Sequence, residues 1–377
     1  MIRGPLYRIA SLTRILATGH RPLIPVLLYP ACAILIVLLL SNLDKLSSPR
    51  APDLENRGAP PVEDGLRAIA AEYAPFIYHA SNPRGARQDI ISNIDFDGDL
   101  RGNNNWENFD TYRLKPTVYY AALETPTHYF ISYHLFHPRD WNPFTVWMND
   151  THENDGENLQ VVVRKSDGLP VLLWTQAHYK SRVYARADSG ITDGSVRVAG
   201  DFIVINGRHA AVFVEAEGHG IYGASDGDSG VIVAEDGAHR FRQGSGMLFR
   251  PARAGEQVEE PAMATSGEAA YQLDSITLKL WPLLRGGLLT GDGKLLDGSY
   301  GYRDELVSIE EVPRYYDGDR VSGPLGRDRG ISPFALDFGF ERGTLGALFF
   351  NPAKRYSESL KIADEWSLDY LDYPFTK

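Results

Sequence analysis

The feature that most constrains this chain is a stretch of uncharged residues, 22–43, that ends in the apolar run 33–40. About 20 apolar residues are enough for an α-helix to cross the hydrocarbon core of a bilayer. Prolines at positions 22, 25 and 30 crowd the first half, so a regular helix is best supported from Pro30 onward. We therefore expect one transmembrane helix within residues 22–43.

The segments on either side of this stretch indicate its orientation. Residues 1–21 carry four arginines and no acidic residue, so the positive-inside rule keeps this tail in the cytoplasm. Residues 44–63 are rich in Pro and Ser without periodicity and are interpreted as a linker, which leaves 64–377 as the exported domain. We expect a single-pass inner-membrane protein whose C-terminal domain is periplasmic. A cleaved signal peptide is the alternative to an uncleaved anchor.

The charge balance supports this division and limits the possible partners. The whole chain has a net charge of -11, and the basic tail lies on the other side of the membrane from the more acidic remainder. An acidic domain disfavours nucleic acid, whose phosphates are bound by Lys and Arg, and it is compatible with divalent cations. The only cysteine, Cys32, lies in the predicted helix, so the exported domain folds without disulfides.

Short β-branched and aromatic runs bounded by turn residues dominate the exported domain. They occupy residues 118–123, 128–133, 159–163, 171–174, 196–199, 202–205 and 211–214. Asn206-Gly207 predicts a hairpin, and residues 165–168 a second turn. The pattern predicts a mainly β fold, an antiparallel β-sandwich with long loop insertions and a few short helices.

The remaining segments carry weaker signals. Apolar spacing predicts a short helix over residues 66–73, and a second helix from 353 to about 371. Residues 225–268 are rich in Gly, Ala, Glu and Arg without clear periodicity, so they are expected to form mostly long loops.

Two carboxylates precede the valine-rich strand in the middle of the domain. Because side chains alternate along a strand, Asp155 and Glu157 share one face with the apolar residue Leu159. An unpaired charge on a core-facing side is costly. His152 lies three residues earlier, in the predicted preceding loop, and can bend back to bind a divalent cation together with both carboxylates. The alternative is a solvated strand end with both carboxylates in water or paired with arginine.

The motif His152-x-x-Asp155-x-Glu157 resembles a degenerate form of the heptapeptide Gly-His-Arg-His-Asp-Trp-Glu of necrosis- and ethylene-inducing peptide-like proteins, with Gly156 in place of Trp. It is also similar to the vacuolar-protein-sorting-associated family, the sixty-second in that series. In the necrosis-inducing group the fold is a β-sandwich whose His, Asp and Glu help hold a divalent cation, and the resemblance implies that role here. Residues 217–222 are similar to a later segment of the group, which implies His219 as a further site residue.

Other residues are weaker candidates, each with a structural role as the alternative. Asp140 is a candidate additional carboxylate ligand, and His178 a histidine that reaches the same site from the next strand. A possible second cation loop has alternating oxygen ligands before and after a glycine, as calcium requires. Its residues are Asn93, Asp95, Asp97 and Asp99.

These observations lead to one functional hypothesis with two alternatives. The leading hypothesis is an envelope module that binds a divalent cation, calcium or magnesium rather than zinc, and recognises a glycan or lipid head group. A metal-dependent hydrolase of phosphate or ester bonds, with His219 or His178 as acid or base, is the first alternative. A structural envelope protein with a stabilising calcium is the second. No catalytic motif stands in its required context, so the sequence leaves open whether the protein is an enzyme.

Overall fold

The computed structural model describes the greater part of residues 64–377. The described residues are 65–141, 151–178, 180–224, 232–233, 239–240, 246–262, 264–297, 314–315, 321–322, 330–339 and 346–375. The predicted basic tail, transmembrane helix and linker lie outside them. Within the described residues, no helix is both long and apolar enough to cross a membrane.

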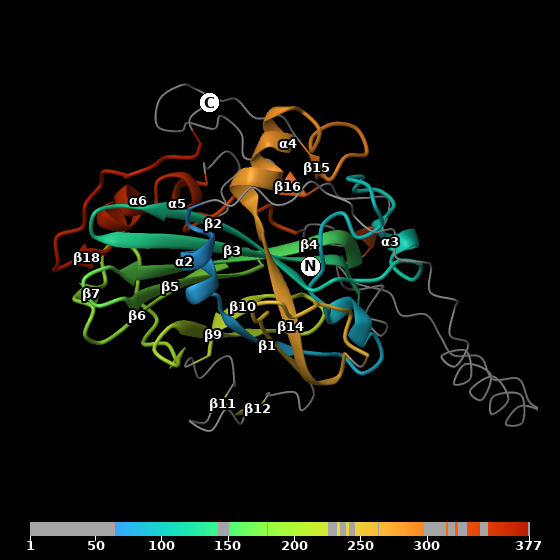
Figure 1. Cartoon of the computed structure of the whole chain (residues 1–377), viewed down its shortest axis with the longest axis horizontal. Helices are drawn as coiled ribbons and strands as arrows, with labels where there is room; N and C mark the ends of the chain where they lie inside the picture. The colour runs from blue at the N-terminus through green and yellow to red at the C-terminus, as the bar shows by residue number, and fades with distance from the viewer. Residues whose placement is uncertain are drawn as a thin grey trace, which may run out of the picture. The chain divides into compact units, whose positions relative to one another are not determined.

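A large mixed sheet of 12 strands organises these residues (Figure 1). In order across the sheet its strands are β10 (Ile221–Gly223), β9 (His209–Val214), β1 (Phe76–Ala80), β13 (Gly246–Pro251), β14 (Ser266–Ser275), β2 (Thr117–Glu124), β3 (His128–Asp140), β4 (Thr151–Arg164), β5 (Leu169–Ala177) and β6 (Lys180–Ala185). β17 (Val321–Ser322) pairs with β4, and β8 (Val204–Ile205) pairs with β9. The mainly β prediction is confirmed.

The expectation of a purely antiparallel sheet is wrong at three pairings. β1 runs parallel to β9, and β14 runs parallel to both of its neighbours, β13 and β2. Parallel neighbours need long connections rather than tight turns, and the sequence provides them between these strands. β10 contacts β5 from the other end of the sheet, so the sheet folds back on itself and encloses the core.

Short helices and two-stranded pairs surround the sheet. The helical segments are α2 (Arg67–Glu72), η1 (Ala86–Asp89), α3 (Asn105–Asn108), η2 (Ile276–Leu280), α4 (Trp281–Arg285), α5 (Ala347–Phe350) and α6 (Pro352–Ser359). The pairs are β11 (Ile232–Val233) with β12 (His239–Arg240), β15 (Leu296–Asp297) with β16 (Arg314–Tyr315), and β18 (Lys361–Ile362) with β7 (Ile191–Thr192). The predicted helix from 353 to 371 stops at Ser359, because Leu360 is extended and leads into β18.

Most predictions of strands and loops hold, with two exceptions. Residues 196–199 form only an isolated bridge, between Val198 and Val183. Residues 225–268, expected to be loops, contain β13 and the start of β14, whose composition has few β-branched residues. The predicted hairpin is present between β8 and β9, where Asn206 and Gly207 have φ of 53° and 69°.

Strand β4 is buried on both faces over almost its whole length. Leu159 and Val161 lie in the main hydrophobic core. On the other face Gln160 donates to Ser132 Oγ at 2.8 Å and to the Leu348 carbonyl of α5 at 2.9 Å. β4 begins at Thr151, so His152, which was expected in a preceding loop, lies within the strand.

Candidate metal centre

Three histidines from separate parts of the chain meet inside the fold. His79 lies on β1, His137 on β3, and His219 on the turn between β9 and β10. All three are fully buried, and one ligand atom from each lies within 4.8 Å of the others. Among the residues that the structure describes, this is the group of side chains that could hold a metal ion.

Hydrogen bonds fix the protonation of two of these rings. The Ala80 carbonyl can only accept, so His79 Nδ1 donates to it at 2.7 Å, and His79 Nε2 is left to accept. His137 Nε2 then donates to His79 Nε2 at 3.0 Å, and His137 Nδ1 is a buried atom without a hydrogen-bond partner. Burial lowers the pKa of His79 to about 4 and that of His137 well below its usual value. Both rings are therefore neutral; the lone pair of His137 Nδ1 is free, and that of His79 Nε2 becomes available to a metal ion once the bond from His137 is broken.

The third ring, His219, is held between two buried carboxylates. Its Nδ1 lies 2.5 Å from Asp155 Oδ2 and its Nε2 lies 3.3 Å from Asp89 Oδ1. Burial on its own lowers the pKa of His219, but the bond to Asp155 and the contact with Asp89 outweigh it and raise the pKa to about 10. The His219 ring also stacks on His137 at a centroid distance of 3.7 Å. Without a metal, His219 is an imidazolium between two anions.

Asp89 ties this turn to the rest of the domain. Its Oδ2 accepts from the Asn82 amide at 2.8 Å, and its Oδ1 accepts from the Glu217 amide at 2.9 Å. Glu217 and His219 both have positive φ, 73° and 51°. Non-glycine residues in this region are strained, and such strain collects at functional sites.

The structure brings together only part of the predicted cation site. Asp155 and His219 meet in the cluster, and Glu157 lies nearby, where its Oε1 accepts from the His178 amide at 2.8 Å. The Nε2 atom of His178 in turn lies 2.5 Å from Oε1 of Glu215.

His152 and Asp140 form a separate contact. Paired across β3 and β4, they have Nε2 and Oδ2 3.8 Å apart. The His152 Nδ1 also bonds the Glu153 carbonyl at 2.9 Å, which holds the ring at that end of β4. His152 is therefore not part of the three-histidine group.

The possible second cation loop is occupied by the protein's own donors. Asp97 accepts from the Asp99 amide at 3.2 Å and from Asn108 at 2.7 Å, while Asn93 donates to Asp95 at 3.0 Å. The Lys279 ammonium lies 3.4 Å from Asp95, so a cation of the chain already supplies positive charge there.

His79, His137 and Asp89 were not identified from the sequence. The β3–β4 register places His137 directly opposite Asp155, a relation that the sequence indicates only once these two strands are paired in that register. His79 sits in the apolar run Phe-Ile-Tyr-His-Ala, where a buried histidine without a function is equally common, and Asp89 belongs to no motif.

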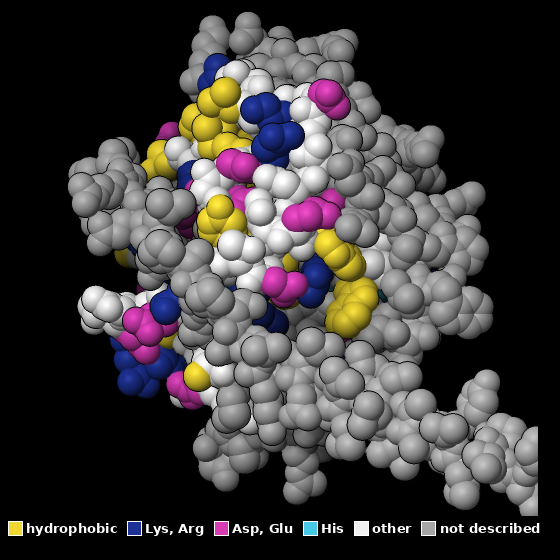
Figure 2. Space-filling view, turned by 90° about the vertical axis from the view of Figure 1, so that its right-hand side faces the viewer, with side chains coloured by type: hydrophobic (Ala, Val, Ile, Leu, Met, Phe, Trp, Pro, Cys, Tyr) yellow, Lys and Arg dark blue, Asp and Glu magenta, His cyan; other side chains and the backbone are white. Residues whose placement is uncertain are grey.

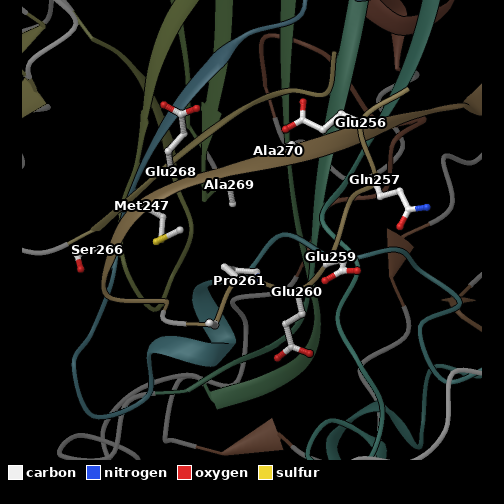
Figure 3. Close-up of a pocket in the computed structure, with 12 residues that line it drawn as sticks. Met247, Glu256, Gln257, Glu259, Glu260, Pro261, Ser266, Glu268, Ala269 and Ala270 are labelled. Atoms are coloured by element: carbon white, nitrogen blue, oxygen red, sulfur yellow. The ribbon is translucent and has the colours of Figure 1, made fainter. Parts of the chain in front are cut away.

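An open pocket of about 460 Å³ lies over β13 and β14, and none of the three histidines lines it (Figure 3). Glu256, Glu259, Glu260 and Glu268 line it together with Met247, which pairs with His79 across β1 and β13. Arg250 forms ion pairs with two of these carboxylates: its Nη1 lies 2.8 Å from Glu256 Oε2, and its Nε lies 2.5 Å from Glu268 Oε1. Where described residues reach the face shown in Figure 2, acidic and basic side chains are interspersed among apolar ones.

Comparisons with known proteins find partial likeness in structure only. No family model matches the chain, and no curated protein matches it in sequence. A solved structure described as a toxin fold for microbial attack and plant defense is 18% identical, with a TM-score of 0.28, over 47% of this chain and 73% of that one. The non-toxic HaNLP3 protein is 17% identical, with a TM-score of 0.29, over 46% and 77%. NLPPya in complex with glucosamine is 17% identical, with a TM-score of 0.27, over 47% and 73%. None of the structures named here concerns the vacuolar-sorting family, for which the resemblance has no support.

Proposed function

We propose that the protein binds one transition-metal ion through His79, His137 and His219. The observation that carries this proposal is the convergence of three fully buried imidazoles, each offering a ligand atom within 4.8 Å of the others. Imidazole suits zinc, copper, iron and nickel, whereas calcium and magnesium prefer oxygen ligands. The proposed metal therefore departs from the calcium or magnesium that the sequence favoured.

The charges around the cluster support a cation. Asp89 and Asp155 place two carboxylates beside His219, and the proton on His219 offsets only one of them. A divalent ion that takes the place of this proton leaves the buried charges balanced, and its binding releases protons to solvent. A neutral His219 that binds the ion through one ring nitrogen would keep one N–H, and this N–H would donate to a carboxylate that orients the ring, as at other histidine metal sites.

The burial of the cluster favours a stabilising metal over a catalytic one. Catalytic metal sites keep one position open to water or substrate, whereas structural sites are closed. The three histidines are fully buried and join β1, β3 and the β9–β10 turn. In this proposal the metal fixes the arrangement of these segments, and the hydrolase alternative is disfavoured.

Metal analysis of the purified full-length chain tests the proposal. We expect about one ion per chain, and thermal unfolding stabilised by about 2.7 kcal/mol at a metal concentration one hundred times the Kd. H79A or H137A should abolish both effects, whereas H209A, which removes a histidine bonded to the Ala74 carbonyl, should not. A wild-type chain without metal, and without any response of its melting temperature to zinc, cobalt or chelator, would contradict it.

We further propose that this module recognises a glycan or lipid head group in the cell envelope, anchored through residues 22–43. The specific observation is an aromatic cluster formed by Trp106, Phe109 and Trp141, whose two indoles are partly exposed around Arg139. Such rings present flat apolar faces with a polar edge, which suits stacking on sugars.

A further inference from the structure

Two arginines contact the same aromatic ring but differ in what their guanidinium groups bind. The guanidinium carbon of Arg87 lies 4.6 Å from the centroid of the Phe109 ring, and that of Arg139 lies 3.9 Å from it. Arg87 uses its nitrogens within the protein: its Nε bonds Glu260 at 2.7 Å, and its terminal nitrogens donate to the carbonyls of Phe109 and Tyr112. Arg87 is therefore a structural arginine.

Arg139 has the same aromatic surroundings without such bonds. Its guanidinium carbon lies 4.8 Å from the ring of Trp106 and 5.6 Å from that of Trp141. Its Nε is buried and has no hydrogen-bond partner. Among the described residues its ion-pair partner is Asp110, 3.9 Å from a terminal nitrogen; the Asp110 side chain is 73% exposed, whereas the arginine side chain is only 13% exposed. Within the described part of the chain, a largely desolvated positive charge thus has only a distant, exposed counter-ion.

Three aromatic rings surround the Arg139 guanidinium carbon, at 3.9 Å (Phe109), 4.8 Å (Trp106) and 5.6 Å (Trp141). Its Nε has no hydrogen-bond partner, and one terminal nitrogen lies 3.9 Å from the exposed Asp110, so the guanidinium keeps donors that a ligand could use. A guanidinium edge forms two parallel bonds with a carboxylate, phosphate or sulfate.

We propose that Arg139 binds an oxyanion of the ligand, so that the recognised glycan or lipid head group is acidic. This inference rests on the proposed ligand-binding function and not on the metal. The same oxyanion chemistry is offered by a uronic acid and by a lipid phosphate.

The rings around Arg139 are held by the elements that carry the metal centre. Gln88, next to Asp89 on η1, donates to the Trp141 carbonyl, and the Trp141 indole lies against Gly85. The Trp106 amide donates to Glu153 Oε1 at 2.6 Å, which ties α3 to β4. Arg139 itself follows His137 by two residues on β3. A metal that fixes these segments also fixes the proposed anion site.

Calorimetric titration of the full-length chain tests the inference with glucuronate, glucose and inorganic phosphate, and with vesicles of phosphatidylglycerol or phosphatidylcholine. We expect at least one acidic probe to bind at least about tenfold more tightly than its neutral counterpart. R139Q should remove this preference. R208Q is the matched control, because Arg208 also stacks on an aromatic ring, Tyr73 at 5.5 Å, but pairs with Glu72 at 3.1 Å.

The outcomes separate the inference from the function on which it rests. Glucuronate binding without vesicle binding assigns the oxyanion to a glycan, and binding of phosphate or of phosphatidylglycerol vesicles without glucuronate binding assigns it to a phosphate such as a lipid head group; both support the role of Arg139. Equal binding of acidic and neutral probes, or an unchanged preference in R139Q, overturns the inference while ligand binding itself stands. No binding of any probe overturns both. If R139Q fails to fold, R139K decides: it keeps the charge but loses the planar fork, and unchanged affinity would exclude the proposed role.

Discussion

At the scale of single residues, His128 links the stability of this domain to pH. Its ring packs against Trp366 at a centroid distance of 4.4 Å, and burial lowers its pKa to about 4. The unfolded chain binds this proton near the ordinary value of 6.5, so between the two pKa values it holds more protons than the folded chain. The contribution of His128 is therefore present above about pH 6.5 and is lost as the pH falls toward 4.

We predict that H128N weakens this dependence. Between pH 6.5 and 4.5 the free energy of unfolding of the wild type should fall more steeply than that of H128N, by up to about 1.4 kcal/mol per pH unit. Urea unfolding at several pH values measures the difference. Parallel pH profiles for the two proteins would show that His128 does not titrate on unfolding.

At the scale of elements, the packing of β4 explains one departure from the heptapeptide. The Ile331 amide donates to the Gly156 carbonyl at 2.7 Å, which brings residues 330–332 against the strand. A Cβ at position 156 would lie 2.6 Å from a ring carbon of Tyr315 and 2.8 Å from one of His134. These two side chains are hydrogen-bonded at 2.7 Å and fill the space that a tryptophan at position 156 would need.

We therefore predict that G156A destabilises the protein by about 1–3 kcal/mol, because the added methyl group overpacks a filled interior. Gly65, which has no neighbouring atom within 4 Å of such a group, gives the matched control G65A. Chemical denaturation of both variants checks the prediction. Equal midpoints for G156A and G65A would mean that the Tyr315–His134 pair moves aside without cost.

β4 also shows how far the sequence could predict this fold and site. Its apolar half, from Leu159, was predicted as a strand, and side-chain alternation placed Asp155 and Glu157 on the same strand face, but His152 was expected in a preceding loop. The whole segment is strand, and distant residues satisfy its polar side chains: Asn158 bonds His134 at 2.9 Å and Gln176 at 2.9 Å. The spacing of polar residues cannot indicate partners that tertiary packing supplies.

The metal centre shows the same limit. Asp155 followed from the alternation of side chains and His219 from a resemblance, so both could be predicted. Asp89 contacts His219 across a long stretch of chain, and no local pattern marks it. His79 becomes a candidate only once β1 lies beside β13 and β9, a pairing with strands far along the sequence.

At the scale of the whole molecule, the predicted anchor can be tested apart from the domain. The hydrophobic core of the described residues belongs to the unit Ala51–Lys377. We predict that the full chain fractionates with membranes and that residues 65–377 alone are recovered in the soluble fraction with a cooperative unfolding transition. Carbonate extraction followed by ultracentrifugation measures the first. Recovery of the full chain in the soluble fraction would contradict the anchor.

The parallel pairings described for β14 have a kinetic consequence. β14 joins β13 and β2, and its partner residues on β2 come from the first half of the chain. Such pairings form only after long stretches of chain have closed, so folding is expected to take milliseconds to seconds or longer. Until β14 has paired with them, β2 and β13 each present an unpaired edge to other chains. Refolding from denaturant should thus be slow, and its yield should fall as the protein concentration rises.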